Sequence, residues 1–596
     1  MEDMSTFHRF YQDKQDLYSA RVQAIQKKLL LVSLLRGACF IVLILSAYYL
    51  LSGFSYPLLF GAVALFAGFI VLVNFYFRLK DERDLQEKLL FVNTNESWLL
   101  DDKPNGFEDG QGLLTSESYL DDLDIFGKRS LFHLLNRTTT IHGKEALATL
   151  LQRPLQSVSE IEKFQQAIRS LAPETDKRQL MTAYGLLKEE KEGNLFGLAS
   201  WLEAPTLLHR QKWALVARWV IMAFNTACLL LLFYTGNYRP LLPGVLAGWI
   251  VTGMFSKYIA QQHVLLGRKH GVLEQYMAIL RVFNTVDPGE SELLRQVRQE
   301  TEQAHGAIRR LARLSNTFDQ GLNFLVAFIL NNLFLYNLNC MIALEKWKEA
   351  NKKFFPGWIE AVGRIELLNS LATFAFNNPA YNYPSPIEGD RLSLVTTKIA
   401  HPLIPAGQRI PNDFIIGNDD QLVLVTGSNM SGKTTFLRTI GVNLLLAQCG
   451  APVCAGSFSF TPMQLLTSLR VSDSLQEQTS YFMAELKKLQ QIIHSLQKGG
   501  PALVLIDEIL RGTNSEDKTY GSEHYIRKLL QYRCLSLFAT HDLSLGKLEL
   551  EKPGVVSNYC FESVIEGGEL HFNYQLQRGI ARNRNASFLM KKMEII

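Results

Sequence analysis

Long apolar runs occur in two pairs in the first half of the chain, each pair joined by a short turn, and Arg218 near the start of the third run is the only charged residue within them. The first pair is Gly37–Leu51 with Pro57–Phe77, and the second is Leu215–Tyr234 with Pro240–Phe255. About twenty consecutive apolar residues are enough to cross a bilayer as a helix. The pattern predicts two transmembrane hairpins, at residues 31–80 and 206–260, although a hairpin buried in a large soluble core would contain similar runs.

Basic residues flank both hairpins and are nearly absent from the turns between the runs. They are Lys27, Lys28 and Arg36 before the first hairpin, Arg78, Lys80 and Arg83 after it, Arg210, Lys212 and Arg218 at the start of the second, and Lys257, Arg268 and Lys269 after it. Basic residues are retained on the cytoplasmic side of membranes. We therefore expect a multi-pass protein of the cytoplasmic (inner) membrane, with both termini and the segment between the hairpins in the cytoplasm.

A fifth apolar run, Leu322–Leu344, differs from the other four because it contains five asparagines. Asparagine is unfavourable in lipid, and a fifth span would place the C-terminal part of the chain outside the cell. We expect this run to be a buried helix of a soluble region.

The remaining sequence predicts helices up to about residue 376 and a separate domain after it. Asp121–Leu155 has apolar residues at helical spacing on both sides of a threonine-rich junction, and Val272–Arg313 is a charged helical region interrupted at Asp287-Pro288-Gly289. Residues 377–400, rich in Asn, Pro and Tyr, are typical of a domain boundary. The expected segments are an N-terminal helix (1–30), the first hairpin (31–80), a helical region (81–205), the second hairpin (206–260), a second helical region (261–376) and a C-terminal domain with a basic tail (377–596).

A phosphate-binding loop lies near the start of the C-terminal domain. The apolar run Leu422–Val425 predicts a buried strand, and a helical pattern begins at Lys433. From the end of the strand to the first residues of the helix, the chain reads Gly427, Ser428, Asn429, Met430, Ser431, Gly432, Lys433, Thr434 and Thr435. This order satisfies G-x-x-x-x-G-K-[ST], in which backbone N–H groups surround the phosphates, Lys433 reaches the outer phosphates, and Thr434 offers its hydroxyl to Mg²⁺. The loop predicts an ATP and Mg²⁺ site.

Two more short apolar strands end in polar residues that suit the same site. Leu503–Ile506 is followed by Asp507 and Glu508, so Asp507 is expected to hold Mg²⁺ through water and Glu508 to polarise the attacking water. Cys534–Phe538 leads to His541, a candidate γ-phosphate sensor. Parallel strands that each present a polar residue at the carboxyl edge are typical of ligand sites in α/β sheets.

These residues resemble the ATPase domain of the MutS mismatch-repair family. The resemblance rests on Gly427–Thr435, Asp507–Thr513 and Ala539-Thr540-His541, together with His401-Pro402-Leu403-Ile404, Pro411-Asn412-Asp413 and Ser480–Glu485. It is strong from 401 to 545 and weaker in Leu131–Leu155 and Glu366–Ala375, which look like parts of that family's helical core.

The resemblance implies an α/β P-loop ATPase of the ABC type, preceded by an all-α core and lever region that here carries the two transmembrane hairpins. It implies a homodimer with composite ATP sites, in which Ser480 contacts the partner's γ-phosphate, Arg511–Ser515 crosses the interface and Asn429 orders the site. The family's mismatch wedge, Phe-x-Glu, does not occur in the first 130 residues. The chain thus resembles a membrane-anchored MutS-like protein without the mismatch-recognition domain.

The motifs also depart from the family pattern. The usual Pro, Gly and Ser of the phosphate loop are Ser428, Ser431 and Thr434, the signature Gly is Gln478, and Leu510 replaces a Gly after the acidic pair. A glutamine side chain hinders close backbone approach to the partner's nucleotide, so we expect firm ATP binding and less efficient hydrolysis.

Three functions remain open from the sequence. The first is a dimeric, membrane-anchored ATPase that binds mismatched, branched or other unusual DNA. The second is a membrane-remodelling or transport-type ATPase without DNA, and the third is a tether that uses ATP as a structural ligand. The net charge of +4 does not itself indicate nucleic acid, and the Lys and Arg residues of 264–313 alternate with Glu and Gln, as on a solvated helix face.

Overall fold

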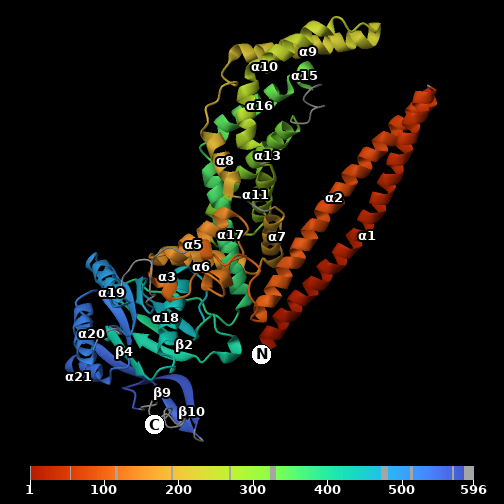
Figure 1. The fold of residues 1–596 in the computed structure, drawn as a ribbon. Coiled ribbons are helices and arrows are strands. Elements are labelled where there is room, and N and C mark those ends of the chain that lie inside the picture. Colours follow the sequence, from red (N-terminus) through yellow and green to blue (C-terminus); the bar gives the residue numbers. More distant parts are fainter. Residues whose placement is uncertain are drawn as a thin grey trace.

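The computed structural model describes residues 2–53, 55–113, 118–188, 192–267, 270–321, 330–417, 419–470, 481–510, 514–566 and 569–582. A helical part up to Asn377 precedes a part built from helices and two β-sheets (Figure 1). This order confirms the expected succession of a helical region and an α/β C-terminal domain.

The helical part contains two long hairpins and a column of shorter helices. Its longer helices are α1 (Glu2–Ser52), α2 (Tyr56–Leu100), α5 (Ile141–Gln152), α6 (Val158–Leu171), α7 (Thr175–Leu186), α8 (Glu192–Glu203), α9 (Lys212–Thr235), α10 (Leu241–Leu266), α11 (His270–Phe283), α12 (Glu292–Thr301), α13 (Ala304–Gln320), α16 (Tyr336–Asn351) and α17 (Phe355–Asn377). The short helices are α3 (Ser118–Asp122), α4 (Leu131–Leu135) and α15 (Asn332–Phe334). The threonine-rich junction expected from the sequence lies before α5, where the Thr140 side chain caps the helix by accepting a hydrogen bond from Gly143 N.

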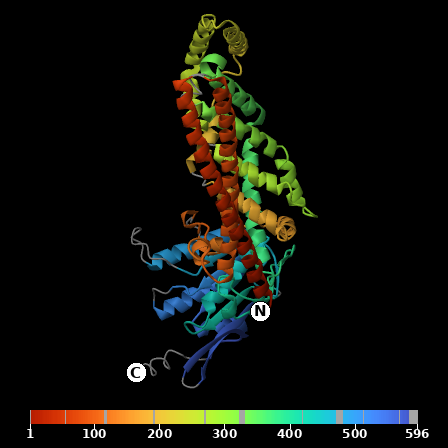
Figure 2. The ribbon, with the colours of Figure 1, turned by 90° about the vertical axis from the view of Figure 1, so that its right-hand side faces the viewer.

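The first hairpin is longer than the sequence pattern predicts. The segment expected as a separate helix (1–30) continues without a break into the apolar run, so α1 and α2 each combine a polar half and an apolar half. A change from polar to apolar residues does not interrupt the backbone hydrogen bonding of a helix, so it sets no helix boundary. Figures 1 and 2 show the α1–α2 turn and the α9–α10 hairpin at the end of the molecule opposite to the sheets.

A buried polar joint connects the lower half of this hairpin to α17. The Arg137 guanidinium contacts the Glu96 carboxylate twice, Nε to Oε1 at 2.5 Å and NH2 to Oε2 at 2.9 Å, and both side chains are almost fully buried. Asn377 Nδ2 donates to Glu96 Oε2 at 2.7 Å, and Tyr11 OH donates to Asn377 Oδ1 at 2.5 Å. The joint lies where α17 leads into the α/β part.

The second hairpin packs closely against α15. A Cβ on Gly244 would lie 1.8 Å from Asn225 Oδ1, and one on Gly248 would lie 2.6 Å from the Asn332 carbonyl oxygen. Asn225 Nδ2 donates to the Leu333 carbonyl at 2.9 Å. Small residues four apart allow helices to approach this closely, as in membrane helix pairs.

The asparagine-rich run belongs to the core where the structure describes it. Residues 322–329 lie outside the described chain, while Leu335, Leu338, Met341 and Leu344 are buried. The expectation of a buried segment is confirmed for that described portion.

Three described helices are long and apolar enough to cross a membrane, by length and composition: Thr6–Ser52, Tyr56–Leu100 and Lys212–Thr235. Helix α10, the fourth expected span, is not among them. One side of it is buried, at Gly244, Gly248, Val251 and Phe255, while Leu242, Leu246, Trp249 and Ile250 are exposed.

The α/β part is built on a six-stranded sheet of order β10-β9-β4-β8-β7-β6. Its strands are β4 (Leu422–Gly427), β6 (Gln464–Ser468), β7 (Ala502–Asp507), β8 (Cys534–Thr540), β9 (Val556–Glu566) and β10 (Glu569–Arg578), and only β10 pairs antiparallel. A four-stranded sheet of order β1-β5-β2-β3 contains β1 (Ser385–Pro386), β2 (Leu394–Ile399), β3 (Asn412–Ile416) and β5 (Ser457–Phe460). The main helices are α18 (Lys433–Gln448), α19 (Tyr481–Gln497), α20 (Ser515–Leu529) and α21 (Leu548–Glu551). The three strands predicted around the phosphate loop, β4, β7 and β8, are adjacent in the larger sheet.

Helix α18 is one of the elements that contact the helical part of the chain. Leu123 packs against Gly441, where an added Cβ would lie 3.0 Å from its methyl carbons. At the end of α18, Leu155 N donates to the Gln448 carbonyl and Gln448 Nε2 donates to the Leu155 carbonyl, both at 3.1 Å. These contacts attach α18 to the helical segment that contains Leu123 and Leu155.

Candidate functional site

The predicted phosphate loop connects the central strand β4 to α18. Met430 and Gly432 adopt the left-handed backbone region, with φ of +67° and +104°. A Cβ on Gly432 would also lie 3.0 Å from the Tyr574 ring, so glycine suits this position on both counts. The Lys433 ammonium turns back over the loop and donates to the carbonyls of Gly427 at 2.8 Å and Ser428 at 2.9 Å.

A cavity of about 990 Å³ opens above this loop. Every predicted residue from Asn429 to Thr435 lines it, as do Asp507, Glu508 and His541. Gly427 and Ser428 lie behind, where their carbonyls hold Lys433. The buried Ser431 hydroxyl has no hydrogen-bond partner among the described residues, so the loop has an unused donor to offer a phosphate.

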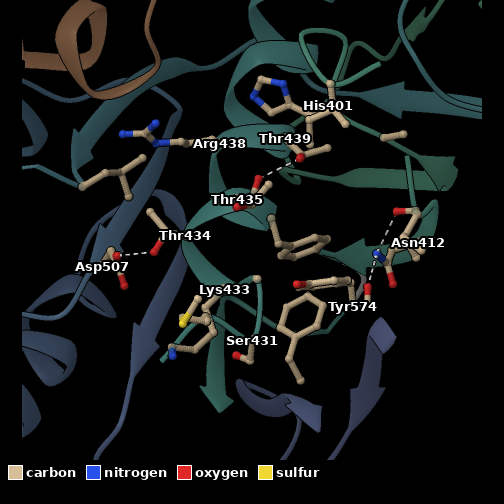
Figure 3. A pocket seen from close by; sticks show the side chains of 18 of the residues that line it. His401, Asn412, Ser431, Lys433, Thr434, Thr435, Arg438, Thr439, Asp507 and Tyr574 are labelled. Carbon is tan, nitrogen blue, oxygen red and sulfur yellow. Dashed lines mark hydrogen bonds between the residues drawn. The ribbon is translucent and has the colours of Figure 1, made fainter. Parts of the chain in front are cut away.

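Thr434 and Asp507 meet at the floor of the cavity. Thr434 Oγ1 donates to Asp507 Oδ2 at 2.6 Å, as the dashed line in Figure 3 marks. Mg²⁺ prefers a few protein oxygens, completed by phosphate oxygens and water. One hydroxyl and one carboxylate oxygen, as Thr434 and Asp507 present them, suit this preference.

Glu508 and His541 are brought together as predicted. Glu508 lies just beyond β7 with a φ of +49°, and its Oε1 is 3.3 Å from His541 Nε2. Lys518, which sequence reasoning missed, lies 3.8 Å from the same oxygen. Burial lowers the pKa of His541, the Lys433 ammonium lowers it further, and the Glu508 carboxylate opposes them. A neutral imidazole beside a carboxylate can orient a water molecule or a phosphate oxygen without adding charge.

Leu510 replaces a glycine of the family pattern, and its backbone keeps a conformation that favours glycine. Leu510 adopts a φ of +61°, a region that favours glycine, and its amide donates to Glu485 Oε1 at 2.8 Å. The neighbouring Gly521 leaves room for the leucine, because an added Cβ there would lie 2.3 Å from Leu510 Cδ1. Leu510, which stands where the family has a glycine, is therefore accommodated because the residue it packs against, Gly521, has no side chain.

The opposite wall of the cavity consists of residues that were not predicted as site residues. Figure 3 shows His401, Asn412 and Tyr574 across the cavity from Lys433 and the Thr434–Asp507 pair. Tyr574 has a φ of +52° at an irregularity in β10, and Asn412 Nδ2 donates to its carbonyl at 3.1 Å. His401 and Asn412 belong to short motifs on which the resemblance rests, and those motifs were the signal for them. Tyr574 had none.

Two of the three arginines in the lining, Arg438 and Arg470, also contact the helical part. Arg438 lies one helical turn beyond Thr434 on α18, and Arg470 follows β6. Both contact Asp124 of the helical part, at 2.7 Å and 2.6 Å. Ser480, Gln478 and Arg511–Thr513 lie outside the described residues, so their expected contacts with a partner subunit stay predictions.

Comparison with known proteins agrees with this geometry. Residues 423–593 match the family model of MutS domain V. The DNA mismatch repair protein MutS of Thermotoga maritima is 30% identical over 270 residues, covering 43% of this chain and 33% of that protein. The DNA mismatch repair protein MutS of Clostridium perfringens is 33% identical over 225 residues, covering 35% and 24%. The human MutS protein homolog 4 is 30% identical over 233 residues, covering 38% and 23%.

The matched region thus spans a third or less of the length of each of these relatives. The segment that matches the family model, residues 423–593, includes the phosphate loop, Asp507, Glu508 and His541. In its C-terminal domain, over residues 423–593, the chain is therefore similar to the MutS family.

Proposed function

We propose that this protein is a membrane-anchored ATPase of the ABC type that hydrolyses ATP with Mg²⁺ and works as a dimer. The observation that supports it most directly is the convergence of Lys433, the Thr434–Asp507 pair, Glu508 and His541 on one cavity. Lys433 and the loop amides would hold the phosphates, and Thr434 and Asp507 would hold Mg²⁺. Glu508 would hold the attacking water, with His541 beside it.

The test is Glu508→Gln in the full-length protein in detergent. We expect the hydrolysis rate to fall about a hundredfold or more, because the group that accepts the water proton is removed, while ATP binding persists. Glu388→Gln, the same change at an exposed residue outside the cavity, should hydrolyse ATP like the wild type. Equal hydrolysis by the Glu508 and Glu388 variants would contradict the assignment.

Dimerisation is proposed from the resemblance to the family, with Ser480 of one subunit completing the ATP site of the other. If it occurs, the Glu508→Gln variant should accumulate as an ATP-bound dimer, because the nucleotide that joins the subunits is not consumed. Sedimentation in detergent with and without ATP measures this, and a monomer under both conditions would contradict a composite site.

Membrane anchoring is proposed from the exposed apolar surface of the two hairpins. Large side chains such as Phe40, Phe60, Phe66, Trp219 and Trp249 are exposed, on helices whose apolar ends lie at one end of the molecule (Figure 2). Exposed apolar area of this extent is unfavourable in water and suits lipid. Residues 31–80 and 206–260 would lie in the cytoplasmic membrane, with the ATPase domain in the cytoplasm.

DNA binding is proposed through the outer face of α13. Arg309, Arg310 and Arg313 are exposed there, and the only acidic residue of the helix, Asp319, is nearly buried, 4.0 Å from His263. The face is therefore more uniformly basic than the mixed sequence of this region suggested. Such a face can neutralise phosphates, and removing one arginine that binds a phosphate should reduce the slope of log affinity against log salt concentration by about one.

The DNA experiment compares the triple variant Arg309→Gln, Arg310→Gln, Arg313→Gln with Lys346→Gln, an exposed position on α16. Binding of branched and mismatched duplexes over a salt series should become weaker and less salt-dependent only in the triple variant. If neither the triple variant nor Lys346→Gln binds DNA at any salt concentration, DNA binding is removed from the proposal.

The membrane-remodelling alternative is favoured by one observation, the length of the apolar helices that extend away from the ATPase domain. It predicts ATP hydrolysis that responds to lipid and not to DNA. A tether would instead bind ATP without hydrolysing it, and the wild-type assay separates these outcomes.

A further inference from the structure

A short acidic segment of the helical part, from the last residue of α3 into the turn before α4, docks beside the nucleotide cavity. Its Asp122 is fully buried and accepts hydrogen bonds from Thr467 Oγ1 at 2.6 Å, Leu469 N at 3.0 Å and Arg470 N at 2.9 Å. The Lys488 ammonium lies 2.9 Å from both of its carboxylate oxygens. Asp122 therefore anchors the segment to the carboxyl end of β6, next to the strand that carries Asp507.

Asp124, two residues later, makes a different kind of contact. It adopts a φ of +53°, and its carboxylate is partly exposed. Oδ2 accepts from Arg438 NH1 at 2.7 Å and Oδ1 accepts from Arg470 NH1 at 2.6 Å, while Arg470 NH2 is 3.4 Å from Oδ2. One carboxylate thus holds two guanidinium groups that also line the nucleotide cavity.

The donors of these arginines are only partly used. Arg438 Nε is buried and has no hydrogen-bond partner within the part of the chain that the structure describes. The Arg470 side chain is about half exposed, at 55%. Guanidinium groups bind phosphate oxygens with paired donors, and a triphosphate carries more negative charge than one carboxylate. Phosphates in this cavity can therefore compete with Asp124 for both arginines.

We propose that Asp124 is a positioning residue that holds Arg438 and Arg470 toward the helical part and releases them when nucleotide binds. The inference rests on the proposed function, that the cavity takes ATP. Asp122 keeps the acidic segment docked in both states, and Asp124 makes the contact that depends on nucleotide. The exchange changes the attachment of α18 to the segment around Leu123, so occupancy of the site is communicated to the helical part.

The test compares Asp124→Asn with Asp121→Asn, which removes the same charge from an exposed neighbour beside the acidic segment. In Asp124→Asn the nucleotide no longer competes with a carboxylate for the arginines, so ATP should bind about twofold to fivefold more tightly than in wild type or Asp121→Asn. A purely structural role for Asp124 would instead weaken ATP binding. Affinity equal to or weaker than that of Asp121→Asn would overturn the inference.

The mechanism is tested separately by hydrogen exchange of the amides between 118 and 152, in detergent, with and without a non-hydrolysable ATP analogue. The analogue should change exchange there in wild type and Asp121→Asn, and the change should be at least halved in Asp124→Asn. An undiminished change in Asp124→Asn would contradict the coupling.

A double-mutant cycle identifies the competing group. In an Arg470→Gln background, Asp124→Asn should alter ATP affinity less than it does in the wild-type background, because one of the held arginines is gone. Full additivity would contradict competition through Arg470. If the wild type binds no ATP, the proposed function fails; if the wild type binds ATP and only the Asp124 comparison fails, the function stands without this inference.

Discussion

At the scale of single residues, burial and neighbouring cations keep the histidines of the cavity neutral. Burial, with the Arg438 guanidinium nearby, lowers the pKa of His401 to about 4, and burial with Lys433 lowers that of His541. The fixed positive charge of the cavity lining therefore comes from Lys433, Arg409, Arg438 and Arg470. Because lysine and arginine stay charged at neutral pH, the attraction for phosphate persists across the physiological range.

His401 gives a prediction for stability against pH. Above pH 6.5 neither the folded nor the unfolded chain holds a proton at this residue, and its contribution is constant. Between pH 6.5 and about 4 the unfolded chain binds the proton first, so stability should fall as the pH falls, by about 3 kcal/mol at most. Thermal unfolding without nucleotide, from pH 7 to 5, measures this.

The comparison is between two variants. His401→Gln should lose stability less steeply over this pH range than wild type, while His494→Gln, at an exposed histidine on α19, should follow the wild-type curve. Parallel curves for wild type and His401→Gln would contradict the assignment of the lowered pKa to this site.

The sequence predicted those site residues that occupy a recognisable position in a local pattern, either within a motif of fixed spacing or at the end of an apolar strand. The phosphate loop lies within a single strand–loop–helix unit, and Asp507 and His541 follow adjacent strands of the same sheet. Tyr574 and Asp124 had no such pattern, because each reaches the cavity through tertiary packing. Tyr574 arrives through an irregularity in β10, and Asp124 comes from the helical part, more than three hundred residues before the arginine that it contacts.

At the scale of elements, hydrophobicity located the helices and misplaced some of their ends. The polar half of α1 was expected as a separate helix because the composition changes near residue 30, but the helix continues to Ser52. Breaks that involve specific backbone chemistry were predicted well, as at Asp287-Pro288-Gly289, which separates α11 from α12. Composition alone thus identifies what surrounds a helix, while proline, glycine and capping residues identify where it ends.

The close packing of α10 gives a prediction at this scale. An alanine at Gly248 would place its Cβ 2.6 Å from the Asn332 carbonyl oxygen, a backbone atom that cannot rotate away. We expect Gly248→Ala to lower the stability of the protein in detergent by about 1–3 kcal/mol. Gly253→Ala, on the same helix with no atom within 4 Å of the added carbon, should be neutral or slightly stabilising, since alanine favours helix. Equal effects of the two changes would contradict tight packing at Gly248.

At the scale of the whole molecule, the two apolar hairpins are far apart in sequence, yet the α1–α2 turn and the α9–α10 hairpin both lie at the end opposite to the sheets (Figures 1 and 2). This arrangement supports one membrane for both, and it could not be inferred from hydropathy, which carries no information on how separate hairpins are oriented. The proposed topology places both turns on the same side of the bilayer, opposite to the ATPase domain.

Cysteine labelling tests the topology. In a Cys39→Ser background, cysteines at Ser52 and Asn237, in or beside the two turns, should react with a membrane-impermeant maleimide in intact cells. A cysteine at Glu82, on the polar half of α2, should react only after the cells are opened. Labelling of all three positions in intact cells, or of only one turn, would contradict two parallel hairpins.

The buried joint at Glu96 has a consequence for how the protein is made. Glu96 is paired with Asn377, and Tyr11 with the same residue, across 281 and 366 positions of the chain. Arg137 follows Glu96 by only 41 positions, so this ion pair can form while the second hairpin is still being synthesised. The contacts of Glu96 and Tyr11 with Asn377 cannot form until α17 has been made. We therefore expect the joint between the first hairpin and α17 to be completed late in biogenesis, when the chain that leads into the ATPase domain emerges.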